Sequence, residues 1–246
     1  MYNNFAEYYD RLMYDADYVG RCDELCRLFE KYDRMPSLLL DLACGTGNFS
    51  TQMAKRGVSV IGVDISPEML GVAKEKSANE GLDILYLCQD ASRLDLYGTV
   101  DGAICCLDSV NHITDYETLC KAFARVSLFL EKDRLFIFDV NTCYKHENVL
   151  ADNVFVFEEE GVFCVWSNEY DPQKRLSTIM LDFFEEDADG RYIRSFDTID
   201  ERAYTDDELQ KAINDAGLEI VARLGEFSDT QPQADTERVV YVTRKV

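Results

Sequence analysis

The chain has 246 residues, of which 47% are hydrophobic, so it can bury the core of one large domain or of one domain with an insertion. Its formal net charge of −22 disfavours binding to a nucleic-acid backbone, which needs clustered Lys and Arg side chains. No run approaches the roughly 18 consecutive apolar residues of a membrane-spanning helix, and the first residues lack the segments of a signal peptide. We therefore expect a cytoplasmic protein whose partners include neither nucleic acid nor membrane.

The nine cysteines are odd in number, and no two of them form a Cys-x-x-Cys pair. Most stand in apolar strand-like runs or in helical patterns. Small buried thiols in a reducing compartment explain this pattern better than a disulfide framework.

Two helices are predicted before the first strand. Residues 5–13 form a short amphipathic pattern rich in tyrosine, and residues 17–32 place apolar side chains at the helical period. Pro36 then excludes further helix and precedes an apolar run.

Strands and helices alternate over the next hundred residues. Short apolar strands separated by helices predict an α/β fold with a doubly wound, mostly parallel sheet and helices on both faces. The expected strands are residues 37–42, 58–63, 84–88, 100–107 and 134–140, and the expected helices are residues 48–56, 67–80 and 116–130.

The pattern changes after residue 149. Four strand-like segments (residues 154–160, 162–170, 176–185 and 192–203) are separated by turn sequences and predict an inserted antiparallel β-meander. A helix over residues 206–216 and two edge strands at 218–227 and 238–243 complete a seven-stranded sheet. We assign residues 1–150 and 204–246 to a core with an N-terminal helical lid, and residues 151–203 to an inserted subdomain that forms a lid or a dimer contact.

Three aspartates lie at or just after the ends of the first three strands of this sheet. Asp41 precedes a turn that contains Gly45 and Gly47, Asp64 ends the second strand, and Asp90 follows the third. Because ligands bind outside the carboxyl ends of parallel strands, these carboxylates should converge on one cleft, although each could instead cap the next helix. Carboxylates there suit ribose hydroxyls and an adenine amino group.

The glycine turn does not match the phosphate-binding motifs. The third glycine of the dinucleotide fingerprint and the lysine of the P-loop are both absent. The turn therefore favours a site for a nucleoside over the phosphate-binding site of an NAD-dependent oxidoreductase or of a nucleoside triphosphatase.

Residues 40–47 (Leu-Asp-Leu-Ala-Cys-Gly-Thr-Gly), residues 63–70 and Gln89-Asp90 resemble the class I S-adenosylmethionine-dependent methyltransferases. With residues 5–13 and 108–112 added, the chain is similar nearly end to end to uncharacterised bacterial small-molecule methyltransferases. Its layout resembles more loosely the aminosugar N-methyltransferases of macrolide biosynthesis. Residues 131–134 depart from the family by replacing a common glycine pair before the fifth strand.

The resemblance implies a Rossmann-like methyltransferase fold and S-adenosyl-L-methionine as cofactor. The implied cofactor residues come from the N-terminal helices and from the ends of the first four strands. They are Asp41, Ala43, Gly45, Thr46 and Gly47 around the methionine moiety, Asp64 at the ribose, Ile65, Met69, Asp90 and Ala91 around the adenine, Leu107 beneath the methionine, and Tyr9 and Tyr18 in the lid.

Methyl transfer from a sulfonium needs positioning and desolvation of the acceptor, and it needs a base only when the acceptor must lose a proton. His112 follows the fourth strand and is the candidate base, although a structural histidine is the alternative. Tyr9 is the second candidate catalytic residue, because an aromatic ring face attracts a positive centre. The alternative is a packing role, which is common for a tyrosine in an amphipathic helix. His146 lies in a polar stretch and is expected at the surface.

We predict a metal-independent enzyme. Asp108, Asp139 and Asn141 could imitate the Mg²⁺ site of catechol-type methyltransferases, but that family places its Asp and Asn side by side. The Pro-Pro-aromatic motif of DNA amino-methyltransferases is also missing after the fourth strand.

The expected acceptor is a small molecule, and N-methylation is favoured over O-methylation. This preference rests on the aminosugar-like layout and on the acidic charge of the insertion. That charge can attract an amine, and the alternative is a solvated acidic surface. The alternative is a non-catalytic cofactor-binding or regulatory protein on the same fold. A homodimer through the β insertion is also expected.

Overall fold

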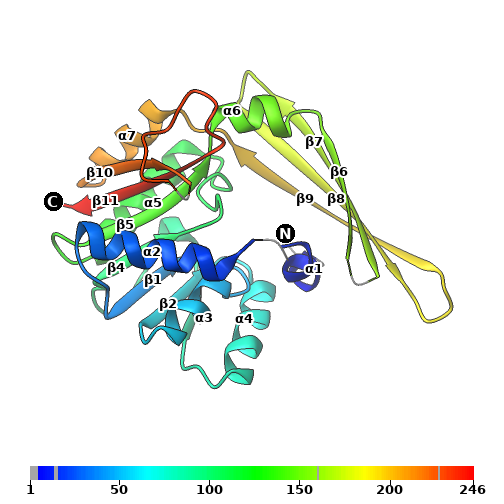
Figure 1. Cartoon of the computed structure of the whole chain (residues 1–246), viewed down its shortest axis with the longest axis horizontal. Helices are drawn as coiled ribbons and strands as arrows, with labels where there is room; N and C mark the ends of the chain where they lie inside the picture. The colour runs from blue at the N-terminus through cyan, green and yellow to red at the C-terminus, as the bar shows by residue number, and fades with distance from the viewer. Residues whose placement is uncertain (1–4, 14–15, 160, 227) are drawn as a thin grey trace.

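The computed structural model describes residues 5–13, 16–159, 161–226 and 228–246 (Figure 1). In this part of the chain, a seven-stranded sheet flanked by helices stands beside a separate four-stranded antiparallel sheet. Every helix in these ranges is too short or too polar to span a membrane.

The larger sheet has the strand order β10-β11-β5-β4-β1-β2-β3. Its β11 runs antiparallel to both neighbours, and the other pairs are parallel. This confirms the doubly wound, mostly parallel sheet. The strands are β1 (Leu38–Leu42), β2 (Ser59–Asp64), β3 (Leu85–Cys88), β4 (Gly102–Cys105), β5 (Leu135–Asn141), β10 (Leu218–Gly225) and β11 (Arg238–Lys245).

Helices cover both faces of this sheet. The helices α2 (Tyr18–Tyr32) and α3 (Asn48–Lys55) pack on one face with Leu39, whereas α5 (Tyr116–Phe129) and α7 (Asp206–Asp215) pack on the other with Leu40. Neighbouring strand residues point to opposite faces, so one apolar run supplies both cores. Each fully buried leucine contributes roughly 1.5–3 kcal/mol.

Local capping fixes where two helices begin. Ser66 accepts a hydrogen bond from the Met69 amide at 3.2 Å at the start of α4 (Pro67–Asn79). Thr205 and Glu208 form the capping box predicted for α7. Both helices therefore start at the predicted residues.

The smaller sheet is the inserted meander. It contains β6 (Val154–Glu159), β7 (Val162–Asp171), β8 (Leu176–Glu186) and β9 (Tyr192–Arg202), all antiparallel, and it is joined to β5 by α6 (Cys143–Lys145) and η2 (His146–Leu150). One face is buried, while the other exposes side chains such as Phe196. This confirms the predicted insertion.

The first helix, α1 (Phe5–Leu12), joins the two sheets (Figure 1). Tyr8 stacks on Phe183 of β8 with 4.8 Å between ring centroids. On the core side, Asp10 accepts a hydrogen bond from Thr46 at 2.7 Å and pairs with Lys76 at 2.6 Å. The helix thereby closes the gap between the glycine turn and the inserted sheet.

Candidate active site

A cavity of about 510 Å³ lies at the carboxyl ends of β1, β2 and β4 and extends to the inserted sheet. Residues of both sheets line it, including Asp64 and Leu107 from the core and Leu181 and Glu201 from the insertion. Its volume is in the range of small-molecule sites. A second cavity of about 30 Å³ lies beside Tyr9 and shares part of its lining.

The two glycines of the turn after β1 have different surroundings. Gly45 lines both cavities at φ 54°, and a Cβ placed there would meet no other described atom within 4 Å. Gly47, at φ 76°, is absent from the described lining of both cavities, and its Cβ would lie 2.5 Å from the Tyr86 hydroxyl. Gly45 thus leaves space for a ligand, whereas Gly47 permits close packing on β3.

Asp64 and Asp90 both line the larger cavity. The Asp64 carboxylate accepts hydrogen bonds from the amides of Gly45 and Ser66, each at 2.8 Å. Burial raises the pKa of Asp64, and these amide bonds oppose the rise. Asp90 accepts from the amide and the hydroxyl of Ser92 at 2.8 Å, so it caps the short helix η1 (Ala91–Arg93) as well as facing the cavity.

Asp41 lies deeper than the other two aspartates. It is 1% exposed, accepts a hydrogen bond from the Ser50 hydroxyl at 2.5 Å, and lines the smaller cavity. Burial raises the pKa of Asp41 to about 7, and the nearby charge of Asp64 adds to the rise.

The other predicted cofactor residues divide between the two cavities. Thr46 and Tyr18 line the smaller one, and Ala43 and Tyr9 line both. Leu107 also lines both, whereas Ile65, Met69 and Ala91 line the larger cavity, where Ile65 is 61% exposed at the rim.

Tyr9 and Tyr18 lie close enough for their side chains to interact. Burial raises the pKa of Tyr9 well above its usual range and raises the pKa of Tyr18 to about 12. Tyr18 also packs edge-on against Phe49 at 5.4 Å. Both phenols therefore stay neutral at physiological pH.

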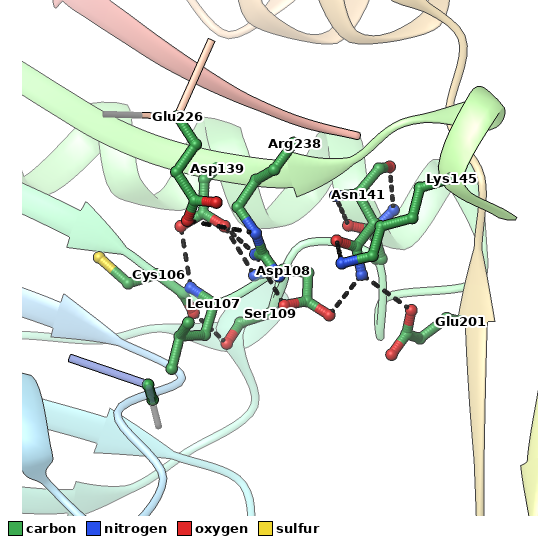
Figure 2. Close-up of polar contacts among 12 residues, drawn as sticks. Cys106, Leu107, Asp108, Ser109, Asp139, Asn141, Lys145, Glu201, Glu226 and Arg238 are labelled. Carbon is green, nitrogen blue, oxygen red and sulfur yellow. Dashed lines mark hydrogen bonds and ion pairs between the residues drawn. The ribbon is translucent and has the colours of Figure 1, made fainter. Parts of the chain in front are cut away.

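A polar network surrounds the chain where it leaves β4 (Figure 2). Leu107 and Asp108 adopt φ values of 53° and 51°, which are unusual for residues other than glycine. The Asp139 carboxylate accepts hydrogen bonds from both of their amides, at 2.8 and 2.9 Å. Arg238 of β11 pairs with Asp139 and, at 2.8 Å, with Asp108. The network therefore holds a strained turn at the cavity.

Neighbouring basic groups together decide the ionisation of Asp108. Burial acts to raise the pKa of Asp108, but Arg238, His112 and Lys145 outweigh it and lower this pKa to about 2. The Asp108 carboxylate also accepts a hydrogen bond from Asn141 at 2.7 Å.

Glu201 of β9 is a lining residue that the sequence analysis missed. It is 3% exposed, and its carboxylate lies 3.7 Å from Nε2 of His112. Burial raises the pKa of Glu201 to about 7, with the charge of Asp108 adding to the rise. The sequence does contain a signal for Glu201: it stands at every second position together with Ile199 and Ala203 along the strand, so it lies on the same, buried face.

The two histidines differ from each other. His112 lines the cavity as predicted, and its Nδ1 is buried without a hydrogen-bond partner among the described residues. The prediction that His146 lies at the surface is wrong. His146 is fully buried, its Nδ1 lies 2.8 Å from the Ser177 hydroxyl, and burial lowers its pKa to about 4. His146 begins the helical turn η2, and its ring reaches Ser177 of β8.

A family model for a methyltransferase domain matches residues 39–130. YqeM of Bacillus subtilis strain 168, named as a methyltransferase without a stated acceptor, is 30% identical over 247 residues, which cover 100% of this chain and 97% of YqeM. The crystal structure of an S-adenosylmethionine-dependent methyltransferase from Clostridium acetobutylicum ATCC 824 has a TM-score of 0.89 and 34% identity, with coverage of 99% and 98%.

The chain belongs to the S-adenosylmethionine-dependent methyltransferases. This methyltransferase is an enzyme that uses S-adenosylmethionine as its methyl donor. Its fold also matches the sugar N-methyltransferase KedS8 from Streptoalloteichus sp. ATCC 53650, with a TM-score of 0.78, 21% identity and coverage of 100% and 93%.

The methyltransferase also brings three metal-binding residue types together. One donor atom from each of Asp108, His112 and Glu201 lies within 4.8 Å of the others. However, the Asp108 carboxylate already pairs with the cation of Arg238, and Asp139 holds two amides as well as Arg238. A divalent ion would have to displace these contacts, so metal independence stays our prediction.

Proposed function

We propose that this enzyme methylates a small-molecule acceptor, with nitrogen favoured over oxygen, and that it needs no metal ion. The observation that carries the proposal is the single cavity of about 510 Å³ that joins the cofactor motifs of the core to carboxylates at its far end. A cavity walled by two sheets suits a small acceptor. The amine preference rests on the buried carboxylate of Glu201 at that end.

The residues at the core end of the cavity fit the cofactor. The open space beside Gly45 leaves the backbone accessible, and the Asp64 carboxylate can accept hydrogen bonds from ribose hydroxyls. Met69, Ile65 and Ala91 offer apolar contacts to an adenine ring, with Asp90 at its edge. S-adenosylmethionine supplies an electrophilic methyl group on a sulfonium.

Tyr9 lies between the larger and the smaller cavity, because it lines both. A neutral phenol ring next to the cofactor favours a positive sulfonium, as in other cation–π contacts. We propose that Tyr9 and Tyr18 close the cofactor site, that Asp41, Thr46 and Leu107 border the methionine moiety, and that Gly47 acts indirectly through the shape of the turn.

We propose that α1 and the inserted sheet (residues 151–203) form the lid of this site. Support comes from Tyr8 and Asp10, which tie α1 to the inserted sheet and to the glycine turn. All nine cysteines are free, which supports the expected cytoplasmic location.

A non-catalytic cofactor-binding protein is the competing function. To distinguish the proposed function from this one, the purified enzyme is incubated with a small-molecule extract and with S-adenosylmethionine that carries a labelled methyl group. We expect label in an extracted amine and a stoichiometric yield of S-adenosylhomocysteine. Tight cofactor binding with no labelled product from any extract would favour the competing function.

A further inference from the structure

Glu201 reaches from the inserted sheet to a polar cluster at the far end of the cavity, which contains Asp108, Asn141 and Arg238. Its side chain points from β9 toward Asn141 and the turn after β4 (Figure 2). The carboxylate is 4% exposed, yet the residue lines the large cavity. A buried carboxylate that faces a cavity is free to contact whatever enters it.

Several charged or titratable groups face Glu201 from the elements around it. Asp108 and His112 come from the segment after β4, Arg238 comes from β11, and His146 comes from η2. His146 Nε2 lies 3.7 Å from the second carboxylate oxygen. The ammonium group of Lys145 donates a hydrogen bond to the side-chain oxygen of Asn141 at 3.1 Å, so it points toward Asn141.

The two carboxylates of this cluster differ in how they are paired. Asp108 has a cation at 2.8 Å and an amide donor at 2.7 Å. Within the described part of the chain, Glu201 has only longer contacts: Asn141 at 3.5 Å, and one histidine at 3.7 Å from each oxygen. Contacts of this length are weak hydrogen bonds at best. Glu201 is therefore the carboxylate with acceptor capacity left for a ligand.

We infer that Glu201 binds the ammonium group of the methyl acceptor and takes up one of its protons before transfer. This assignment rests on the proposed function and names its substrate class, a primary or secondary amine. The ordinary pKa of a carboxyl would make it a poor base toward an amine, but burial raises the pKa of Glu201 to about 7. His112, 30% exposed, lies on the route from Glu201 to solvent.

The step balances in protons and electrons. One proton of the ammonium passes to the Glu201 carboxylate, and the freed nitrogen lone pair forms the N–C bond while the C–S electron pair leaves with the sulfur. The product amine carries one positive charge. Glu201 returns its proton through His112 to solvent, so one proton is released for each methyl group transferred.

The test uses sinefungin, a cofactor analogue with an amine in place of the sulfonium methyl group, and S-adenosylhomocysteine, which lacks that amine. Isothermal titration gives the affinity of each for wild type and Glu201→Gln at pH 6, 7 and 8. In wild type we expect sinefungin to bind more tightly than S-adenosylhomocysteine, by a ratio that rises with pH as Glu201 ionises. In Glu201→Gln this ratio should fall about 10-fold and vary less with pH.

The matched control is Asp200→Asn. Asp200 is the neighbouring carboxylate on the exposed face of β9, where it accepts from Thr178 at 2.7 Å, so its removal should leave the ratio unchanged. If Glu201→Gln does not fold, Glu201→Asp and the wild-type pH series decide in its place.

The outcomes separate the two proposals. An equal ratio in wild type and Glu201→Gln, with S-adenosylhomocysteine bound normally, would overturn the role of Glu201 alone. Failure of wild type to bind S-adenosylhomocysteine would overturn the proposed function.

Discussion

Three carboxylates near the cavity differ in ionisation because their partners differ. Arg238 keeps the pKa of Asp108 at about 2 despite its burial. Glu201 and Asp41 are more deeply buried than Asp108 and have no Lys or Arg cation in contact among the described residues, so burial raises both pKa values to about 7. The site thus combines a fixed negative charge with carboxyl groups that can exchange protons near neutral pH.

Asp41→Asn should change how stability depends on pH. The pKa of Asp41 has its ordinary value of 3.8 in the unfolded chain and is about 7 in the folded protein. Between these pH values, the folded state therefore holds a proton that the unfolded state has lost. The free energy of unfolding contributed by Asp41 therefore falls as pH rises through this window and levels off above pH 7. Asn removes this dependence.

Urea denaturation of both proteins between pH 5.5 and 7.5 measures the effect; lower pH approaches the isoelectric point of about 4.4. The free energy of unfolding of Asp41→Asn, taken relative to that of wild type, should rise by about 2 kcal/mol between pH 5.5 and 7. The exposed Asp83→Asn should follow wild type closely. A constant difference between Asp41→Asn and wild type across this range would show that Asp41 is ionised in the folded state.

At the scale of elements, α1 is held on the core mainly through Asp10. Its carboxylate accepts from Thr46 at 2.7 Å and Asn48 at 2.8 Å and pairs with Lys76 at 2.6 Å. The first two contacts connect α1 to residues that follow Gly45, and the third connects it to α4. Motion of α1 should therefore be coupled to the glycine turn.

Asp10→Ala should loosen α1 without unfolding the core. Loss of these charge-assisted bonds should speed amide hydrogen exchange in α1 about 10-fold and leave exchange in α5 unchanged. Asp95→Ala, which removes an exposed pair with Arg125 at 3.3 Å, serves as control. Unchanged exchange in α1 would mean that the inserted sheet alone holds this helix.

The order of elements could be predicted because each strand and helix is specified by a contiguous pattern. The end of β4 could not, since the predicted strand runs to residue 107 while the turn at Leu107 depends on Asp139 and Arg238. The burial of His146 likewise depends on β8, and Glu201 joins the site only through the pairing of β9. Contacts between distant segments were the missing information.

At the scale of the whole molecule, charge and an apolar surface act in opposite directions. The outward face of the inserted sheet exposes Val156 and Phe196, which are 64% and 71% accessible and lie in one cross-strand row. Two copies with a net charge of −22 each repel one another, and salt screens that repulsion. Any association through this face should therefore strengthen with ionic strength.

We predict a homodimer through the inserted sheet that is populated at 300 mM salt and weakened at 20 mM. Phe196→Glu should give a monomer in sedimentation velocity, whereas Leu128→Glu, at an exposed apolar position of α5, should not. A wild-type monomer at high protein concentration in both salts would contradict the dimer.

The cavity at the glycine turn should bind the methyl donor. The most direct measurement is isothermal titration of S-adenosylhomocysteine into wild type and Asp64→Ala, with melting curves to show that both are folded. Asp64 positions the Gly45 amide at 2.8 Å and faces the cavity, so we predict one site per chain in wild type and at least a 10-fold loss of affinity in the variant. No binding to wild type, or equal binding to a folded Asp64→Ala, would contradict the account.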